Sequence, residues 1–127
     1  MLSMQEVNAL GQILNDTYGA SSTVAAPTHS IKYVMQGDVI TFAYTTIANI
    51  VMGFDPHEQL KEQARESVTR IKAKVKDTEK AFKAAAGRDL KLKEISSDDS
   101  VEVISMSPHN PKRTVYYRRK TSYKIGA

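Results

Sequence analysis

Hydrophobic residues recur every three or four positions between Asp55 and Gly87, and this spacing predicts one long amphipathic helix. Asp55 and Pro56 mark its start, because Asp caps free N–H groups and proline needs no N–H at the first helical position. Gly87 predicts its end, since glycine adopts the left-handed conformation at little cost. The stripe expected to be buried consists of Leu60, Ala64, Val68, Ile71, Val75, Thr78 and Phe82.

The length of this helix, residues 55–87, constrains the architecture. At about 1.5 Å per residue it would span roughly 46 Å. A globule of this chain length has a diameter of only about 36 Å. The helix is therefore expected to protrude, to bend or to pack against a second subunit.

Alternating hydrophobic and polar residues predict a β-hairpin over residues 31–52. Gly37-Asp38 suits a two-residue turn, and pairing outward from it places Tyr33 opposite Phe42. One face of the hairpin should receive the helix stripe, and the other face is more polar. The apolar face consists of Ile31, Tyr33, Met35, Ile40, Phe42 and Tyr44. The second strand stays β-prone to Met52 and outruns its partner, so its far end is available to pair with another chain.

The remaining patterns complete an α+β order within a single domain, residues 1–127. Ser3 and Glu6 form a capping box that starts an N-terminal helix over residues 1–19, and residues 20–30 are expected to form a loop. Residues 90–125 predict a three-stranded antiparallel meander, with strands at 90–95, 101–106 and 114–125. The polar run 96–100 and the segment 107–111 are expected to be its turns. We expect the helices to pack on one face of a single twisted sheet.

Positive charge is concentrated at the C-terminus. The chain has a net charge of +4, but residues 112–127 alone carry +6 and no acid, which leaves −2 for the first 111 residues. The basic character therefore belongs to one segment. If this segment is a strand, one face carries a tyrosine among cations, a chemistry that suits phosphates and a stacked base. The candidate nucleic-acid-binding residues are Lys112, Arg113, Tyr116, Arg118, Lys120 and Lys124. The other interpretation is that these bases protect an edge strand from aggregation.

Motifs for catalysis or metal binding are missing from the sequence. It contains no phosphate-binding glycine loop, no G-x-S-x-G and no cysteine. His57-Glu58 lacks the second histidine of a zinc helix, because Lys61 occupies that position. Asp98-Asp99 lacks the spacing and the glycine of a calcium loop. We expect a protein that is not an enzyme and that uses no cofactor and no metal.

These features predict a non-catalytic structural or assembly subunit that contacts copies of itself or other proteins. The alternative is a nucleic-acid-binding module that uses the C-terminal strand. Candidate oligomer contacts are Ile47, Ile50, Ile71, Val75 and Phe82. No apolar run approaches the roughly 20 residues of a membrane span, and the N-terminus lacks the pattern of a signal peptide. A cytoplasmic location is expected, or the host cytoplasm or virion for a viral protein.

Overall fold

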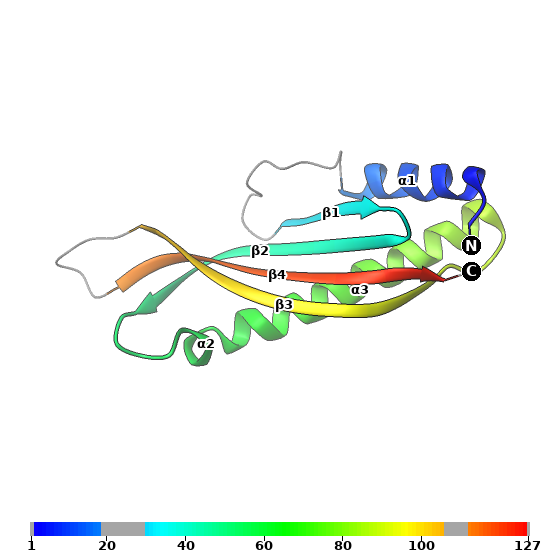
Figure 1. The fold of residues 1–127 in the computed structure, drawn as a ribbon. Helices are drawn as coiled ribbons and strands as arrows, with labels where there is room; N and C mark the ends of the chain where they lie inside the picture. Colours follow the sequence, from blue (N-terminus) through cyan, green and yellow to red (C-terminus); the bar gives the residue numbers. More distant parts are fainter. Residues whose placement is uncertain (1, 19–29, 106–111, 127) are drawn as a thin grey trace.

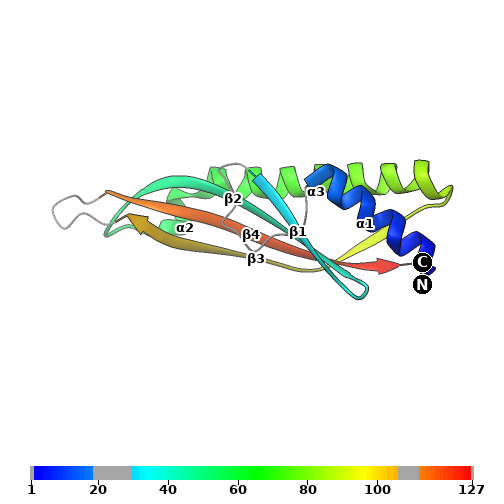
Figure 2. The same ribbon diagram turned by 90° about the horizontal axis from the view of Figure 1, so that it is seen from above.

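The computed structural model describes residues 2–18, 30–105 and 112–126, which form a four-stranded antiparallel sheet with its helices on one face (Figures 1 and 2). In Figure 1 the sheet faces the viewer and the long helix runs behind it. This arrangement confirms the expected α+β class. The elements are α1 (Met4–Tyr18), β1 (Ser30–Gln36), β2 (Val39–Val51), α2 (Pro56–Gln59), α3 (Lys61–Ala86), β3 (Lys91–Ser105) and β4 (Lys112–Gly126).

The β1–β2 hairpin has the register that the sequence predicts. Tyr33 pairs with Phe42 across the turn, and Gly37 has a φ of 59°, which a glycine adopts without strain. Tyr33, Phe42 and Tyr44 are buried beneath the helices, while Val34 on the other face is exposed. The alternation along the hairpin therefore identified its buried face correctly.

The strand order is β1-β2-β4-β3, so the C-terminal strand lies in the interior of the sheet. β2 and β4 pair over their full common length, from Val39 opposite Lys124 to Val51 opposite Lys112. The far part of β2 thus has a partner within its own chain. On its other side, the described residues of β1 pair with β2 only as far as Thr45.

The turn expected at residues 96–100 is wrong, because these residues lie inside one continuous strand, β3. Ser97 Oγ and Thr121 Oγ1 of β4 are hydrogen bonded at 3.1 Å, and Asp98 pairs with Lys120 in the register. Polar partners on β4 thus stabilise a polar segment as strand. The expected meander therefore has two strands in place of three, with irregularities in β3 between Glu94 and Ser96 and near its end. Of the loop expected over residues 20–30, residues 20–29 lie outside the described residues and Ser30 begins β1. The turn expected at 107–111 also lies outside the described residues.

The helix expected over residues 55–87 is interrupted at Leu60, which separates α2 from α3. Gln59 accounts for the interruption: its Oε1 accepts from Val51 N at 2.7 Å, and its Nε2 donates to Val51 O at 3.0 Å. Its side-chain amide therefore continues the hydrogen-bonding ladder of β2, while Leu60 is buried against the sheet. The predicted start and end of the helix are confirmed. Asp55 Oδ1 accepts a hydrogen bond from His57 N at 3.0 Å, and Gly87 has a φ of 76°.

Two hydrophobic clusters connect α3 to the sheet. The first joins Phe82 to Leu10 and Leu14 of α1 and to Tyr123 of β4; the second surrounds Leu60 near the other end. At 26 residues, α3 is about 39 Å long, and β4, with 15 residues, extends about 50 Å. The long strands and α1 therefore cover the stripe without a second subunit. Four candidate oligomer contacts are buried within the chain itself, namely Ile50, Ile71, Val75 and Phe82.

The N-terminal helix α1 is fixed at its start by the predicted capping box. Ser3 N donates to Glu6 Oε1 at 3.0 Å, and Glu6 N donates to Ser3 Oγ at 3.2 Å. Glu6 also forms an ion pair with Arg88, which follows α3. The hydrogen bond from the Ser3 backbone is the main cause that lowers the pKa of Glu6, and Arg88 acts in the same direction. The same contacts thus cap α1 and attach it to the end of α3.

Candidate binding surface

The face of the sheet opposite the helices carries the predicted basic residues. Burial alternates along β4: Val115, Tyr117 and Tyr123 lie beneath the helices, and the residues between them lie on the uncovered face. Lys112, Tyr116, Arg118, Lys120 and Lys124 therefore share that face. Arg113 does not join them, because it alternates with Lys112 and pairs with the buried Ile50. Its Nη1 donates to the Lys112 carbonyl at 3.0 Å.

Two further lysines come to this face from the neighbouring strands. Lys93 of β3 pairs directly with Lys124, and Lys32 of β1 shares a register row with Lys120 through Ala43 of β2. The hairpin register already placed Lys32 on the polar face. That this hairpin would lie beside β4 was not predictable from the sequence. We call the resulting group the cationic sheet face: Lys32, Lys93, Lys112, Tyr116, Arg118, Lys120 and Lys124.

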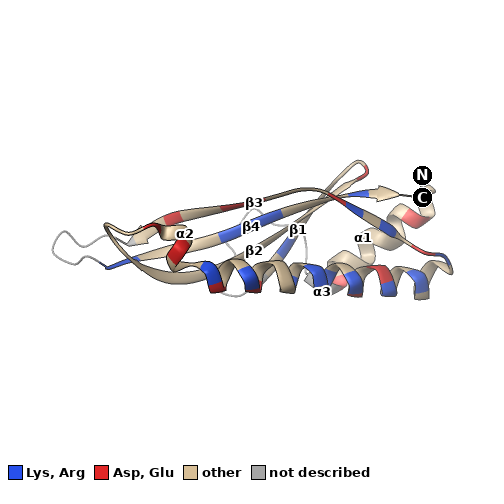
Figure 3. Cartoon of the chain, turned by 90° about the horizontal axis from the view of Figure 1, so that it is seen from below, with Lys and Arg blue, Asp and Glu red and all other residues tan. Residues whose placement is uncertain are grey.

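Acidic residues neutralise the cationic sheet face only in part. Asp98 and Glu102 of β3 lie on the same face, opposite Lys120 and Tyr116 in the register. Among the described residues, Lys120 and Lys93 form no ion pair, and Lys124 Nζ lies 3.9 Å from Asp38 Oδ2 in the β1–β2 turn. Figure 3 shows several Lys and Arg positions along β4 and acidic positions along the neighbouring β3. Positive charge therefore predominates on this face.

Small side chains lie between the cations. Thr41 Oγ1 and Ser122 Oγ, on adjacent strands of this face, are hydrogen bonded at 2.8 Å. Arg118 lies against the same surface, because its Nε donates to Thr45 Oγ1 at 3.2 Å. Ala43 also lies between cations, in the row that joins Lys32 to Lys120. Small side chains therefore form the floor between the cations in this part of the face, and the Arg118 side chain lies against that floor.

An exposed apolar group lies at the end of the sheet away from α1. It includes Ile47 and Val51 of β2, Phe54 before α2, and the end of β3. We call this group the apolar end: Ile47, Val51, Met52, Phe54, Val103 and Ile104. Exposed apolar groups of this kind are typical of protein contacts. Ile47 is the one candidate oligomer contact that remains exposed.

A polar network lies on the opposite face, between α3 and the sheet. Arg119 donates from Nε to Ser67 Oγ at 2.8 Å, from Nη1 to Ser97 Oγ at 3.0 Å, and from Nη2 to the Tyr117 hydroxyl at 3.1 Å. The Tyr117 hydroxyl donates in turn to Asp99 Oδ2 at 3.0 Å. Burial raises the pKa of Tyr117, and the hydrogen bond to Asp99 adds to this effect, while Ser67 and Arg119 oppose it. This network was not predicted from the sequence.

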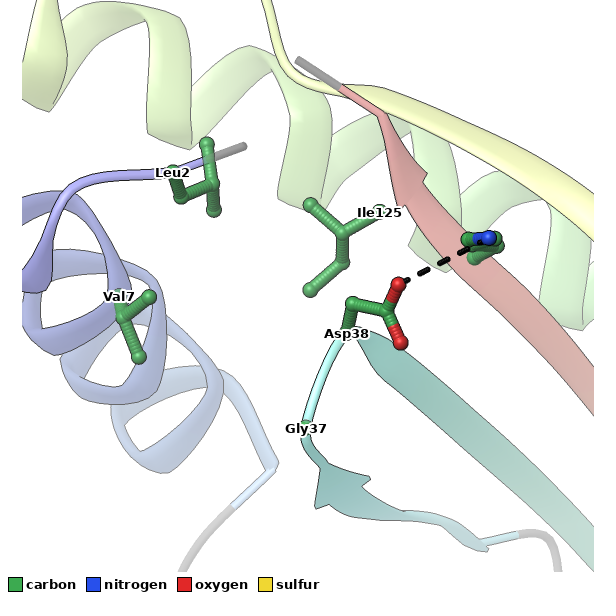
Figure 4. Close-up of a pocket in the computed structure, with 6 residues that line it drawn as sticks. Leu2, Val7, Gly37, Asp38 and Ile125 are labelled. Carbon is green, nitrogen blue, oxygen red and sulfur yellow. Dashed lines mark ion pairs between the residues drawn. The ribbon is translucent and has the colours of Figure 1, made fainter.

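A cavity of about 530 Å³ lies between the start of α1, the β1–β2 turn and the end of β4 (Figure 4). Leu2 and Val7 face Ile125 across it, and the ion pair between Asp38 and Lys124 borders it. The backbone closes one side, because Ile125 N donates to Asp38 O at 2.7 Å. Its mainly apolar lining would favour an apolar ligand, and it meets the cationic sheet face only at Lys124.

Within residues 2–18, 30–105 and 112–126, no group of three or more His, Asp or Glu side chains is placed to hold a metal ion. His57 lies in α2, and the other two histidines, His29 and His109, fall outside the described residues. None of the described helices combines the length and apolarity needed to cross a membrane. Comparisons of the chain with protein-family models, with curated proteins and with solved structures gave no match.

Proposed function

We propose that this protein is a non-catalytic binding subunit whose cationic sheet face holds nucleic acid. The observation that supports this most is that cations from three strands gather on an uncovered face with few acids. Lysine and arginine side chains that contact phosphates release condensed counterions, and this release drives binding. The floor of small residues lets a phosphate backbone approach the strands closely.

The proposal is tested by replacing three lysines of the cationic sheet face with alanine: Lys93, Lys120 and Lys124. All three are exposed, so folding should be retained. We expect the affinity for labelled oligonucleotides, measured by fluorescence anisotropy at 100 mM salt, to fall at least about tenfold. The slope of log affinity against log salt should become shallower by about 2, because each lost phosphate contact contributes about 0.7–0.9.

The matched control replaces Lys72, Lys76 and Lys80 on the outer face of α3, which are also exposed. It removes the same residue type and the same net charge from the opposite side of the molecule. We expect the affinity of this control for the oligonucleotides to fall less than about threefold. Equal losses in the two triple variants would show that net charge alone drives binding, and would overturn the proposed site. Absence of binding to both single-stranded and duplex oligonucleotides at 50 mM salt would overturn the proposed function.

A second candidate function is assembly with further copies of this chain, and the apolar end favours it. Val51 and Phe54 are exposed there. Burying apolar side chains of this size in an interface lowers the free energy, because it removes their surface from water. Sedimentation velocity at micromolar concentration should then show a dimer or larger species. Phe54→Glu should return it to a monomer, because a buried unpaired charge is costly. A wild-type monomer at 100 μM would exclude this candidate.

A further inference from the structure

We infer that the cationic sheet face binds single-stranded nucleic acid in preference to duplex, with one base stacked on Tyr116 and adjacent phosphates held by Arg118, Lys120 and Lys124. This inference rests on the proposed function and adds the class of nucleic acid and the role of each residue. It follows from three observations: the shape of the face, the place of its aromatic residue and the row of cations beside it.

The shape of the face disfavours a duplex. Beside residues 118–124 of β4, four strands about 4.8 Å apart make a surface more than about 14 Å wide, whereas the major groove of B-DNA is about 12 Å wide and admits a helix or a two-stranded ribbon. The cations lie mainly on β4, which is an interior strand. A cylinder resting on this face would touch the interior strands along a narrow line. A flexible single strand can instead follow the surface of the sheet.

Tyr116 provides a surface on which a base can stack. It is half-buried and lies between Ile47 of β2 and Glu102 of β3 in the register, on the uncovered face. Tyr33, Tyr44, Tyr117 and Tyr123 are buried, whereas Tyr116 is partly exposed and lies two residues from Arg118 on the same face. Stacking on an aromatic ring is available to every base, whereas bases inside a duplex are already stacked on each other.

The phosphate contacts lie along the same strand. Arg118 is two residues from Tyr116 on the same face, a separation of about 6.6 Å. The Nε bond to Thr45 Oγ1 orients its guanidinium along the sheet, and among the described residues its Nη groups form no hydrogen bond or ion pair. Lys120 and Lys124 continue the row, and Lys93 lies beside Lys124. From Tyr116 to Lys124 the row extends about 26 Å, a length that suits a short single-stranded segment of at least about 4 nucleotides.

The experiment compares three labelled probes by fluorescence anisotropy: a 12-nucleotide oligothymidylate, the same strand with abasic sites at its central positions, and a 12-base-pair duplex. We expect the oligothymidylate to bind at least about tenfold more tightly than the duplex. Tyr116→Leu should weaken oligothymidylate binding by about 5- to 100-fold, the range for loss of one stacked base, and should leave duplex binding unchanged. Tyr116→Phe keeps the ring and should bind like the wild type.

The abasic probe keeps the test independent of how well Tyr116→Leu folds, since it removes the base and leaves the protein intact. It should lose about the same affinity for the wild-type protein as Tyr116→Leu loses for the intact probe. Equal affinities for duplex and single strand, or equal affinities for the intact and abasic probes, would overturn this inference and leave the proposed function standing. Absence of binding to all probes would overturn both.

Discussion

Phe82→Ala is expected to lower the free energy of unfolding by about 3–5 kcal/mol, the largest effect of any single change considered for this protein. Phe82 is fully buried where α3 meets α1 and the sheet, in the cluster that contains Leu10, Leu14 and Tyr123. The substitution removes the transfer free energy of the ring and leaves a cavity that three separate elements would have to move to fill. For a chain of this size the melting temperature should fall by roughly 10–25 °C.

The matched control is Phe54→Ala, which removes the same atoms from a side chain that is 69% exposed. We expect its free energy of unfolding to change by less than about 0.5 kcal/mol. Chemical denaturation of both variants measures the difference in their free energies of unfolding. Each free energy is calculated from the midpoint of the transition and from the slope of the free energy against denaturant concentration. If the two variants had equal stability, the assignment of Phe82 to the core between α1 and α3 would be wrong. A large loss for Phe54→Ala alone would indicate that the apolar end is covered by another molecule.

Arg119→Ala should be the second most damaging change, at about 2–3 kcal/mol. Removing one member of a buried charge pair costs about 3–5 kcal/mol, and we reduce this figure because the Arg119 and Asp99 side chains are 14% and 28% exposed. The guanidinium lies within hydrogen-bonding distance of Ser67 on α3 and of Ser97 on β3. Its loss leaves the buried Ser67 hydroxyl and the partly buried Asp99 carboxylate with fewer hydrogen-bond partners.

Two further variants separate the network from charge alone. Lys120→Ala removes a cation from the adjacent position on the opposite, exposed face, and should change stability by less than about 0.5 kcal/mol. Arg119→Lys keeps the charge but lacks the fork that reaches several oxygens, so most of the loss should remain. Thermal unfolding of Arg119→Ala, Arg119→Lys and Lys120→Ala compares their stabilities. If Arg119→Lys were as stable as the wild type, charge would be sufficient and the forked hydrogen bonds would not matter.

A double-mutant cycle between Arg119→Ala and Ser67→Ala measures how strongly the network couples α3 to the sheet. Residues in one hydrogen-bonded network show interaction energies of about 0.5–3 kcal/mol. Arg119 Nε lies 2.8 Å from Ser67 Oγ, so this pair should fall within that range. Strict additivity of the two substitutions would contradict the direct bond. In that case the effect of Arg119→Ala would come from its contacts within the sheet.

Features that depend on neighbouring residues were predictable from the sequence. The turn at Gly37-Asp38 and the alternation around it identified the hairpin register and its buried face. The three-and-four spacing identified the helix stripe, and the left-handed preference of glycine identified its end at Gly87. The alternation in the C-terminal strand placed Tyr116, Arg118, Lys120 and Lys124 on one face, as the structure has them. Arg113, which was grouped with them, lies on the other face. In each case the period of the backbone relates residues a few positions apart.

Features that depend on remote partners were not predictable. Residues 96–100 have the composition of a turn, yet they form a strand because Thr121, Lys120 and Tyr117 of β4 supply partners for their side chains and backbone. The helix divides at Leu60 because Gln59 bonds to the end of β2. The sequence contains no local sign of either contact, since a polar side chain is stable in whichever environment satisfies its hydrogen bonds.

The candidate site illustrates the same division. By itself, the sequence determined that the last strand carries a tyrosine and several cations on one side, because alternation in a strand is a local property. Only the tertiary structure decided that β4 lies inside the sheet, with Lys32 and Lys93 on its flanks and helices on the other face alone. Strand order depends on which distant surfaces bury together and which polar groups find partners. The free energy of those contacts belongs to pairs of remote segments, so neither segment alone specifies it.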